Sequence, residues 1–292
     1  MPKHTDLAME ARELWQESAK KEEQLPGVKT GRWTLGGVTA DQVQITDKQA
    51  EQALGKPCGT YVTLQWQKNL LRDPDGFSKV ARLLGNQLRQ MLPRTGSVLV
   101  VGLGNSVVTP DALGPKTLEH LVVTRHLGQE FPKLRCVSAM APGVLGTTGL
   151  ESLEVVRGVV ERSKPCTVVV VDALASRNLN RVCTTVQLAD TGITPGSGVG
   201  NRRMAFNRQT LGVPVIAVGV PTVVQAQTLL WDVLEKNGVK DGKIEEKCDN
   251  SMIVTPQDID AGVDRLARLL GCGISLGLHR KLTVSDVSCF VG

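Results

Sequence analysis

Aromatic residues are scarce in this chain of 292 residues, at 3% of the sequence. Its core must therefore be built from aliphatic side chains, and the Val- and Leu-rich runs are typical of strands covered by helices on both faces. Hydrophobic residues make up 41% and charged residues 22%, as expected of a globular protein. The length fits one large domain, or one domain with elaborations.

The sequence also lacks the marks of membrane and nucleic-acid proteins. No run approaches the roughly 18 apolar residues of a membrane-spanning helix. The first residues, Met1 to Asp6, lack the apolar core of a signal peptide. The formal charge is only +5, and no basic stripe is interleaved with aromatic residues. We therefore expect a cytoplasmic protein with neither a membrane nor a nucleic acid as a direct partner.

Metal-binding patterns are missing as well. None of the seven cysteines forms a Cys-x-x-Cys pair, and their odd number indicates reduced thiols in a reducing compartment. None of the four histidines (His4, His120, His126 and His279) falls at a predicted strand end beside an acidic residue. These residues predict no metal ligand set and no cofactor.

What the chain does have is a regular alternation of strands and helices. Strands are predicted at 97–102, 135–139, 166–171, 182–188 and 213–218, and helices at 5–24, 76–92, 109–127, 149–161 and 222–234, with a last helix after Thr255-Pro256. This order predicts an α/β fold with a mostly parallel sheet flanked by helices. Short additional strands are expected near the N-terminal third, and 28–75 and 238–252 are expected to be elaborations.

Two acidic residues follow two of the apolar runs. The strand predicted at 97–102 leads into a helix start that carries Asp111, and a second run of valines ends at Asp172. Asp111 alone could complement a helix dipole, and Asp172 alone could be a solvated loop residue. Together they favour an active site, because the active sites of parallel sheets lie at the carboxyl ends of the strands and paired carboxylates can activate water.

Two other motifs are weaker. Gly102-Leu-Gly104 suggests dinucleotide binding, but Val107 stands where the third glycine would be, which disfavours an oxidoreductase. Asp190-Thr-Gly192 resembles the triplet of pepsin-like proteases, which are all-β and need two triplets. Asp190 is therefore expected to be a turn residue and is kept as a reserve catalytic candidate.

A glycine-dense loop follows Asp190. The N–H groups of Gly196, Ser197 and Gly198 could hold a substrate main chain or a developing oxyanion, although a plain tight turn would use the same residues. Next come three polar residues, Asn201, Arg202 and Arg203. They form either a solvated face or a patch that pairs with acidic side chains of a substrate.

Longer stretches of the sequence resemble the germination protease family of endospore-forming bacteria. The resemblance extends over nearly the whole chain and rests on these segments: His4 to Ala11, Val100 to Asn105, Val108 to Pro115, Ala141 to Glu151, Val171 to Ala175, Asp190 to Asn201 and Leu211 to Val224. It implies an endopeptidase that begins the degradation of small acid-soluble spore proteins during germination. It also implies a homotetramer, made as a zymogen in the forespore, whose two essential aspartates correspond to Asp111 and Asp172. The implied fold is similar to that of hydrogenase-maturation peptidases.

The resemblance also implies substrates that are cut at a short motif, Glu then Phe or Ile, then Ala-Ser-Glu, which is an acid, an apolar residue, Ala, a further residue and Glu. Asp6-Leu7-Ala8-Met9-Glu10 has the same pattern, which predicts self-cleavage between Asp6 and Leu7. Residues 1–6 would then be a pro-segment and residues 7–292 a single peptidase domain. Relatives carry a longer leader, so strong inhibition by six residues is not expected.

The predicted mechanism has one aspartate of the pair acting as a general base while the other keeps its proton. Arg202 and Arg203 are candidates to read the acidic residue before the cut. Two other functions stay open: a metal-dependent peptidase of the hydrogenase-maturation type, with a metal at Asp111 and Asp172, and a non-catalytic binding relative.

Overall fold

A single sheet runs through the computed structural model, which describes residues 5–19, 25–128, 131, 133–200, 203–236 and 252–291. Its strands lie in the order β1-β2-β3-β7-β8-β6-β4-β5, and β9 pairs with β8. The bounds are β1 Val28–Leu35, β2 Val38–Ile45, β3 Gly59–Trp66, β4 Val98–Gly102, β5 Val137–Met140, β6 Thr167–Ala175, β7 Thr185–Ala189, β8 Val215–Gln225 and β9 Ile253–Val254.

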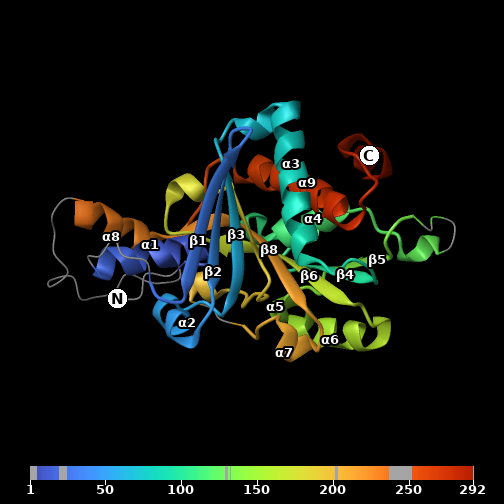
Figure 1. Cartoon of the computed structure of the whole chain (residues 1–292), viewed down its shortest axis with the longest axis horizontal. Helices are drawn as coiled ribbons and strands as arrows, with labels where there is room; N and C mark the ends of the chain where they lie inside the picture. Colours follow the sequence, from blue (N-terminus) through green and yellow to red (C-terminus); the bar gives the residue numbers. More distant parts are fainter. Residues whose placement is uncertain are drawn as a thin grey trace.

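Helices cover both faces of this sheet, so the predicted α/β class is confirmed (Figure 1). Figure 1 shows α3, α4 and α9 on one face and α6 and α7 on the other. The bounds are α1 Ala8–Ala19, α2 Lys48–Leu54, α3 Pro74–Met91, α4 Leu113–Glu119, α5 Leu145–Thr148, α6 Ser152–Ser163, α7 Arg208–Leu211, α8 Ala226–Lys236, α9 Ile259–Leu278 and α10 Val284–Val291.

The sheet is mixed, and its parallel part is confined to β8, β6, β4 and β5. The predicted short strands of the N-terminal third form an antiparallel meander, β1-β2-β3, which joins the same sheet through β7. The parallel half thus sets the carboxyl ends of β4 and β6 side by side. The predicted pairing of Asp111 and Asp172 depends on this arrangement.

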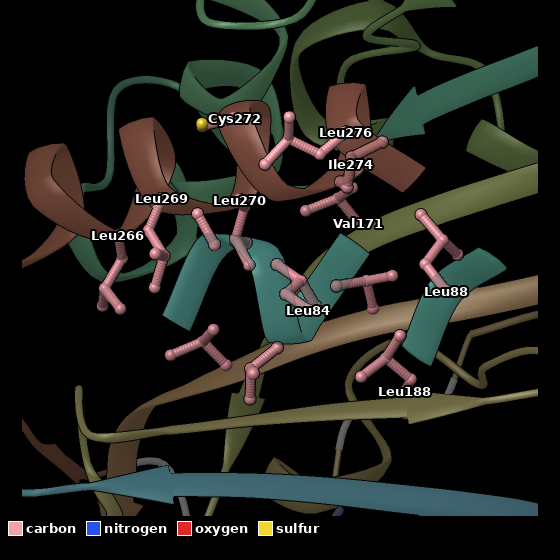
Figure 2. Packing of buried hydrophobic residues seen from close by; sticks show 14 of the residues in the cluster. Leu84, Leu88, Val171, Leu188, Leu266, Leu269, Leu270, Cys272, Ile274 and Leu276 are labelled. Atoms are coloured by element: carbon pink, nitrogen blue, oxygen red, sulfur yellow. The ribbon is translucent and has the colours of Figure 1, made fainter. Parts of the chain in front are cut away.

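The core is aliphatic, as the shortage of aromatic residues predicts. Figure 2 shows leucines of α9, among them Leu266 and Leu270, in one cluster with Leu84 and Leu88 of α3 and Val171 of β6. All five side chains are almost fully buried. Burying one such side chain stabilises the fold by roughly 1.5–3 kcal/mol.

Several predicted element ends are wrong. The helix expected over 109–127 is a 3-10 turn, Thr109–Asp111, followed by the short α4. The strand expected to end at 171 continues to Ala175, and β8 continues through Thr222, where a helix was expected. Both strands are longer because they pair with each other past the predicted stops, as far as Ala175 and Val223.

The C-terminal segment differs in the same way. Thr255 does not cap α9, because its hydroxyl donates 2.9 Å to the carbonyl of Thr222 and the helix begins only at Ile259. A further helix, α10, follows it. In the part of the chain that the structure describes, no helix is long and apolar enough to span a membrane.

Candidate active site

Asp172 lies within β6, directly after a residue that pairs with the end of β4. It shares its strand face with Val168 and Val170, because alternate side chains of a strand point the same way. Its residue is only 5% exposed, and one carboxylate oxygen accepts a 2.9 Å hydrogen bond from the N–H of Ala173. The sheet thus holds a carboxyl group where its neighbours along the strand are apolar.

Asp111 ends the 3-10 turn that follows β4. The N–H of Asn105 donates a 2.7 Å hydrogen bond to its Oδ2, which fixes the carboxylate over the turn. The Thr222 hydroxyl, on β8, donates 2.7 Å to the carbonyl of Pro110 and ties the same turn to the sheet.

Two glycines allow this turn to approach the sheet. A Cβ on Gly114 would lie 2.1 Å from the carbonyl oxygen of Leu103 and 2.7 Å from that of Val171, so only glycine fits without backbone movement. A Cβ on Gly102 would meet the Gly114 carbonyl at 2.4 Å. The close contact of β4, β6 and α4 therefore sets where Asp111 lies relative to Asp172.

The two carboxylates line one cavity of about 610 Å³. Burial raises the pKa of Asp172 well above its ordinary value, and the charges of Asp111 and Asp6 raise it further, against the lowering effect of the Ala173 N–H. Burial also raises the pKa of Asp111, and here the Asn105 N–H opposes it. The pair is therefore expected to share a proton, which Asp172 holds the more firmly.

The glycine loop lies beside this pair and contacts the N-terminal segment. The Ser197 hydroxyl donates a 2.6 Å hydrogen bond to Oδ1 of Asp6. The N–H of Ala175, at the end of β6, donates 2.9 Å to Oδ2 of the same side chain. Gly196 also lines the cavity of the two acids, and Gly198 is buried against Asp6. The structure thus brings Asp6 and the loop to the predicted acids.

The residues after Asp6 are held by two polar side chains that the sequence motifs do not single out. Leu7 is fully buried, and the Gln187 side chain accepts a 2.8 Å hydrogen bond from the N–H of Ala8. Arg181 donates 2.8 Å to the Glu10 carboxylate, which also accepts from the N–H of Arg177 at 2.7 Å. A polar residue inside the apolar strand run 185–189 was the available signal for Gln187.

The other candidates lie elsewhere. Asp190 is exposed, lines neither described cavity and accepts a 2.8 Å hydrogen bond from the N–H of Thr60, as a turn residue would. Arg203 lines the cavity of the two acids and lies 3.6 Å from Glu151. Asn201 and Arg202 lie outside the described residues, as does most of the predicted elaboration 238–252.

Among the residues that the structure describes, no group of three or more His, Cys, Asp or Glu side chains is placed to hold a metal ion. His279 lies away from the cavity lining, where its Nδ1 accepts from the N–H of Arg135.

The chain was compared with known proteins. The family model described as germination protease matches residues 8–239. The germination protease of Caldanaerobacter subterraneus subsp. tengcongensis is 43% identical, covering 97% of this chain and 96% of its own length. That of Clostridium tetani is 36% identical over the whole of both chains. A solved NiFe hydrogenase maturation protease, HycI from Thermococcus kodakarensis, is 19% identical with a TM-score of 0.36, covering 64% of this chain and 98% of that one.

Proposed function

Because this chain belongs to the germination protease family, and is therefore a peptidase, we propose that it is the endopeptidase that begins the degradation of small acid-soluble spore proteins. It would act in the cytoplasm of the spore core as a homotetramer, with neither a nucleic acid nor a membrane as a direct partner. The observation that carries the proposal is the shared cavity of Asp111 and Asp172, two carboxyl groups with raised pKa values.

In the proposed mechanism Asp111 is ionised and Asp172 is protonated. Asp111 takes a proton from a water molecule as that water attacks the carbonyl carbon of the substrate. Asp172 gives its proton to the reacting carbonyl oxygen. As the C–N bond breaks, Asp111 passes its proton to the leaving amine and Asp172 takes one back from a hydroxyl of the intermediate, which restores the pair. Support comes from the deeper burial of Asp172, which disfavours its charged form more than that of Asp111.

The chain would also cut itself between Asp6 and Leu7 and so remove its own leader. Support comes from the place of Asp6, whose residue lines the same cavity as the two acids. The enzyme would be an atypical aspartic-type peptidase made as a precursor.

The test is incubation of the purified chain with a small acid-soluble spore protein, with the cuts mapped by mass spectrometry. Asp111→Asn and Asp172→Asn should each lower cleavage by about 10²–10⁴-fold, the usual contribution of a general acid or base. Asp190→Asn serves as the matched variant, because its carboxylate bonds the Thr60 N–H away from the cavity, and it should cut normally.

Three results would contradict the proposal. Near-normal activity in both cavity variants would remove the carboxylates from the mechanism. Activity lost to a chelator and restored by a metal ion would instead make Asp111 and Asp172 metal ligands. Binding of the spore protein without any cut would indicate a non-catalytic relative.

A further inference from the structure

Asp6 lies where two cavities meet. The cavity of about 610 Å³ holds Asp111 and Asp172, and a second one of about 990 Å³ is lined by Gln187, Tyr61 and others. Asp6 and Leu174 line both. The N-terminal segment therefore lies across what would be a continuous groove leading to the two acids.

The side chain of Asp6 fills a site that is built for a carboxylate. The Ser197 hydroxyl and the Ala175 N–H each donate to a different oxygen, at 2.6 and 2.9 Å. Gly198 closes the third side, because a Cβ there would lie 2.2 Å from Oδ2 of Asp6. We call Ala175, Ser197 and Gly198 the acid seat.

The main chain around the same residue is also held by hydrogen bonds. The N–H of Asp6 donates 3.0 Å to the carbonyl of Ala175. The Gln187 amide donates 3.1 Å to the carbonyl of Asp6, which belongs to the peptide bond before Leu7. Lys56 donates 2.9 Å to the carbonyl of Thr5. These hydrogen bonds to the main chain could form with a peptide of any sequence, whereas the acid seat binds only an acidic side chain.

We infer that the acid seat is the subsite for the acidic side chain that precedes the scissile bond of a substrate, and that Asp6 fills it before any substrate does. The inference rests on the proposed function in taking the ligand to be a peptide that is cut after an acidic residue. In this inference the acidic residue is recognised by neutral hydrogen-bond donors on Ser197 and Ala175. It is not recognised by Arg203, whose guanidinium lies near Glu151.

The negative charge of an acidic residue gives a reason why the acid seat would select one. The negative charge of Asp6 is one of the causes that raise the pKa of Asp172. An acidic substrate residue in the seat would act in the same way and help Asp172 to keep the proton that the mechanism requires. The seat offers hydrogen bonds without a positive charge, so it does not cancel this effect.

Direct binding tests the inference without relying on catalysis. The probe is a fluorescent, amidated peptide of residues 1–6 in two versions, ending in Asp or in Asn. The protein is the full chain carrying Asp111→Asn, so that the probe is not cut, with and without Asp6→Ala. Removing the resident carboxylate should let the Asp probe bind about tenfold tighter or more, as expected for hydrogen bonds to a charged group, and the Asn probe should gain little.

Further variants, each made in the Asp6→Ala chain, identify the residues that recognise the acidic side chain of the probe. Ser197→Ala and Gly198→Ala should abolish the preference for the Asp probe. Ser152→Ala and Gly146→Ala should keep it, because both residues line the cavity of the two acids, the Ser152 hydroxyl bonds the Gly143 carbonyl, and a Cβ on Gly146 meets nothing within 4 Å.

Two outcomes would overturn the inference: equal affinity for the two probes, or a preference that Arg203→Gln removes and Ser197→Ala leaves intact. Circular dichroism of each variant checks that it is folded. A chain that prefers the Asp probe but never cuts a spore protein would keep the acid seat and overturn the endopeptidase.

Discussion

In the proposed mechanism, Asp172 is the residue at which function and stability oppose each other. Its carboxyl group is buried in β6, and its pKa is raised mainly by that burial. Below the pKa of an Asp side chain in the unfolded chain, about 3.9, Asp172 is protonated in both the folded and the unfolded state. Between that value and the higher folded pKa only the native state holds it, so stability falls as the pH rises. Above the pKa of Asp172 in the folded state, the carboxyl group is ionised in both states. The full free-energy cost of burying the charged carboxylate then remains.

Asp172→Asn should therefore stabilise the protein at neutral pH while it lowers cleavage by about 10²–10⁴-fold. We expect a gain of about 0.5–2 kcal/mol in the free energy of unfolding, typical of removing a strained functional group. The gain should vanish near pH 3, where the native carboxyl is neutral in any case. Thermal unfolding between pH 3 and pH 8 measures this. Parallel curves for the variant and the parent chain would show that Asp172 ionises freely.

At the scale of elements, the connection from β4 to α4 sets the site. A 3-10 turn carries Asp111, and glycines at 102 and 114 let this connection lie directly on β6. The turn is tied to β8 by the hydroxyl of Thr222. The position of Asp111 thus depends on backbone contact between elements rather than on the helix cap that the sequence suggests.

Gly114→Ala tests that dependence. Its Cβ would overlap two backbone carbonyls, so we expect a loss of about 1–3 kcal/mol in stability and a fall in cleavage as Asp111 shifts. Gly158→Ala is the matched control, because Gly158 is exposed within α6 and a Cβ there meets nothing. It should stabilise the chain by about 0.5–1 kcal/mol through helix propensity and leave cleavage unchanged. Chemical denaturation and a peptide assay measure both, and an active Gly114→Ala chain would refute the argument.

The same scale shows where sequence reasoning fails. Strand and helix types were predictable because valine runs alternate with amphipathic segments. Their ends were not, since β6 and β8 are extended by pairing with each other as far as Ala175 and Val223. Pairing between distant residues has no local signature, so Asp172 was expected after a strand and lies inside one.

For the whole molecule, the N-terminal segment lies in the chain's own cavity. Asp6 bonds residues about 170 to 190 positions away, in β6, β7 and the glycine loop. If the chain cuts itself at this place, the reaction is intramolecular and needs no second molecule.

Self-cleavage should then follow first-order kinetics. The rate constant should stay the same when the chain is diluted about 100-fold, because the cut bond and the acids belong to one fold. Mass spectrometry of timed samples, starting from freshly refolded chain, measures it. As a control, adding an excess of Asp111→Asn chain, which cannot cut itself, should leave that substrate intact. A rate that rises with concentration would show cutting between molecules.

The candidate site was predictable in part. Asp111 and Asp172 are far apart in sequence, but parallel strands end at one edge, so two acids after two apolar runs were enough to pair them. The acid seat was predictable only in its glycine-loop part, Ser197 and Gly198, because Ala175 comes from β6 and only the fold brings it to Asp6. Gln187 is a single polar residue in a strand, and only the sheet register shows that it reaches the same peptide as Ser197.

If the chain cuts itself after Asp6, the charge of this residue beside the two acids would favour one direction of the reaction. A cut after this residue would add a terminal carboxylate to a cavity that already holds negative groups, and repulsion would drive the short fragment out. The remainder would stay in place, because Glu10 is anchored to Arg181 on the other side of the break. Expulsion of one piece and retention of the other would make maturation irreversible without any further partner.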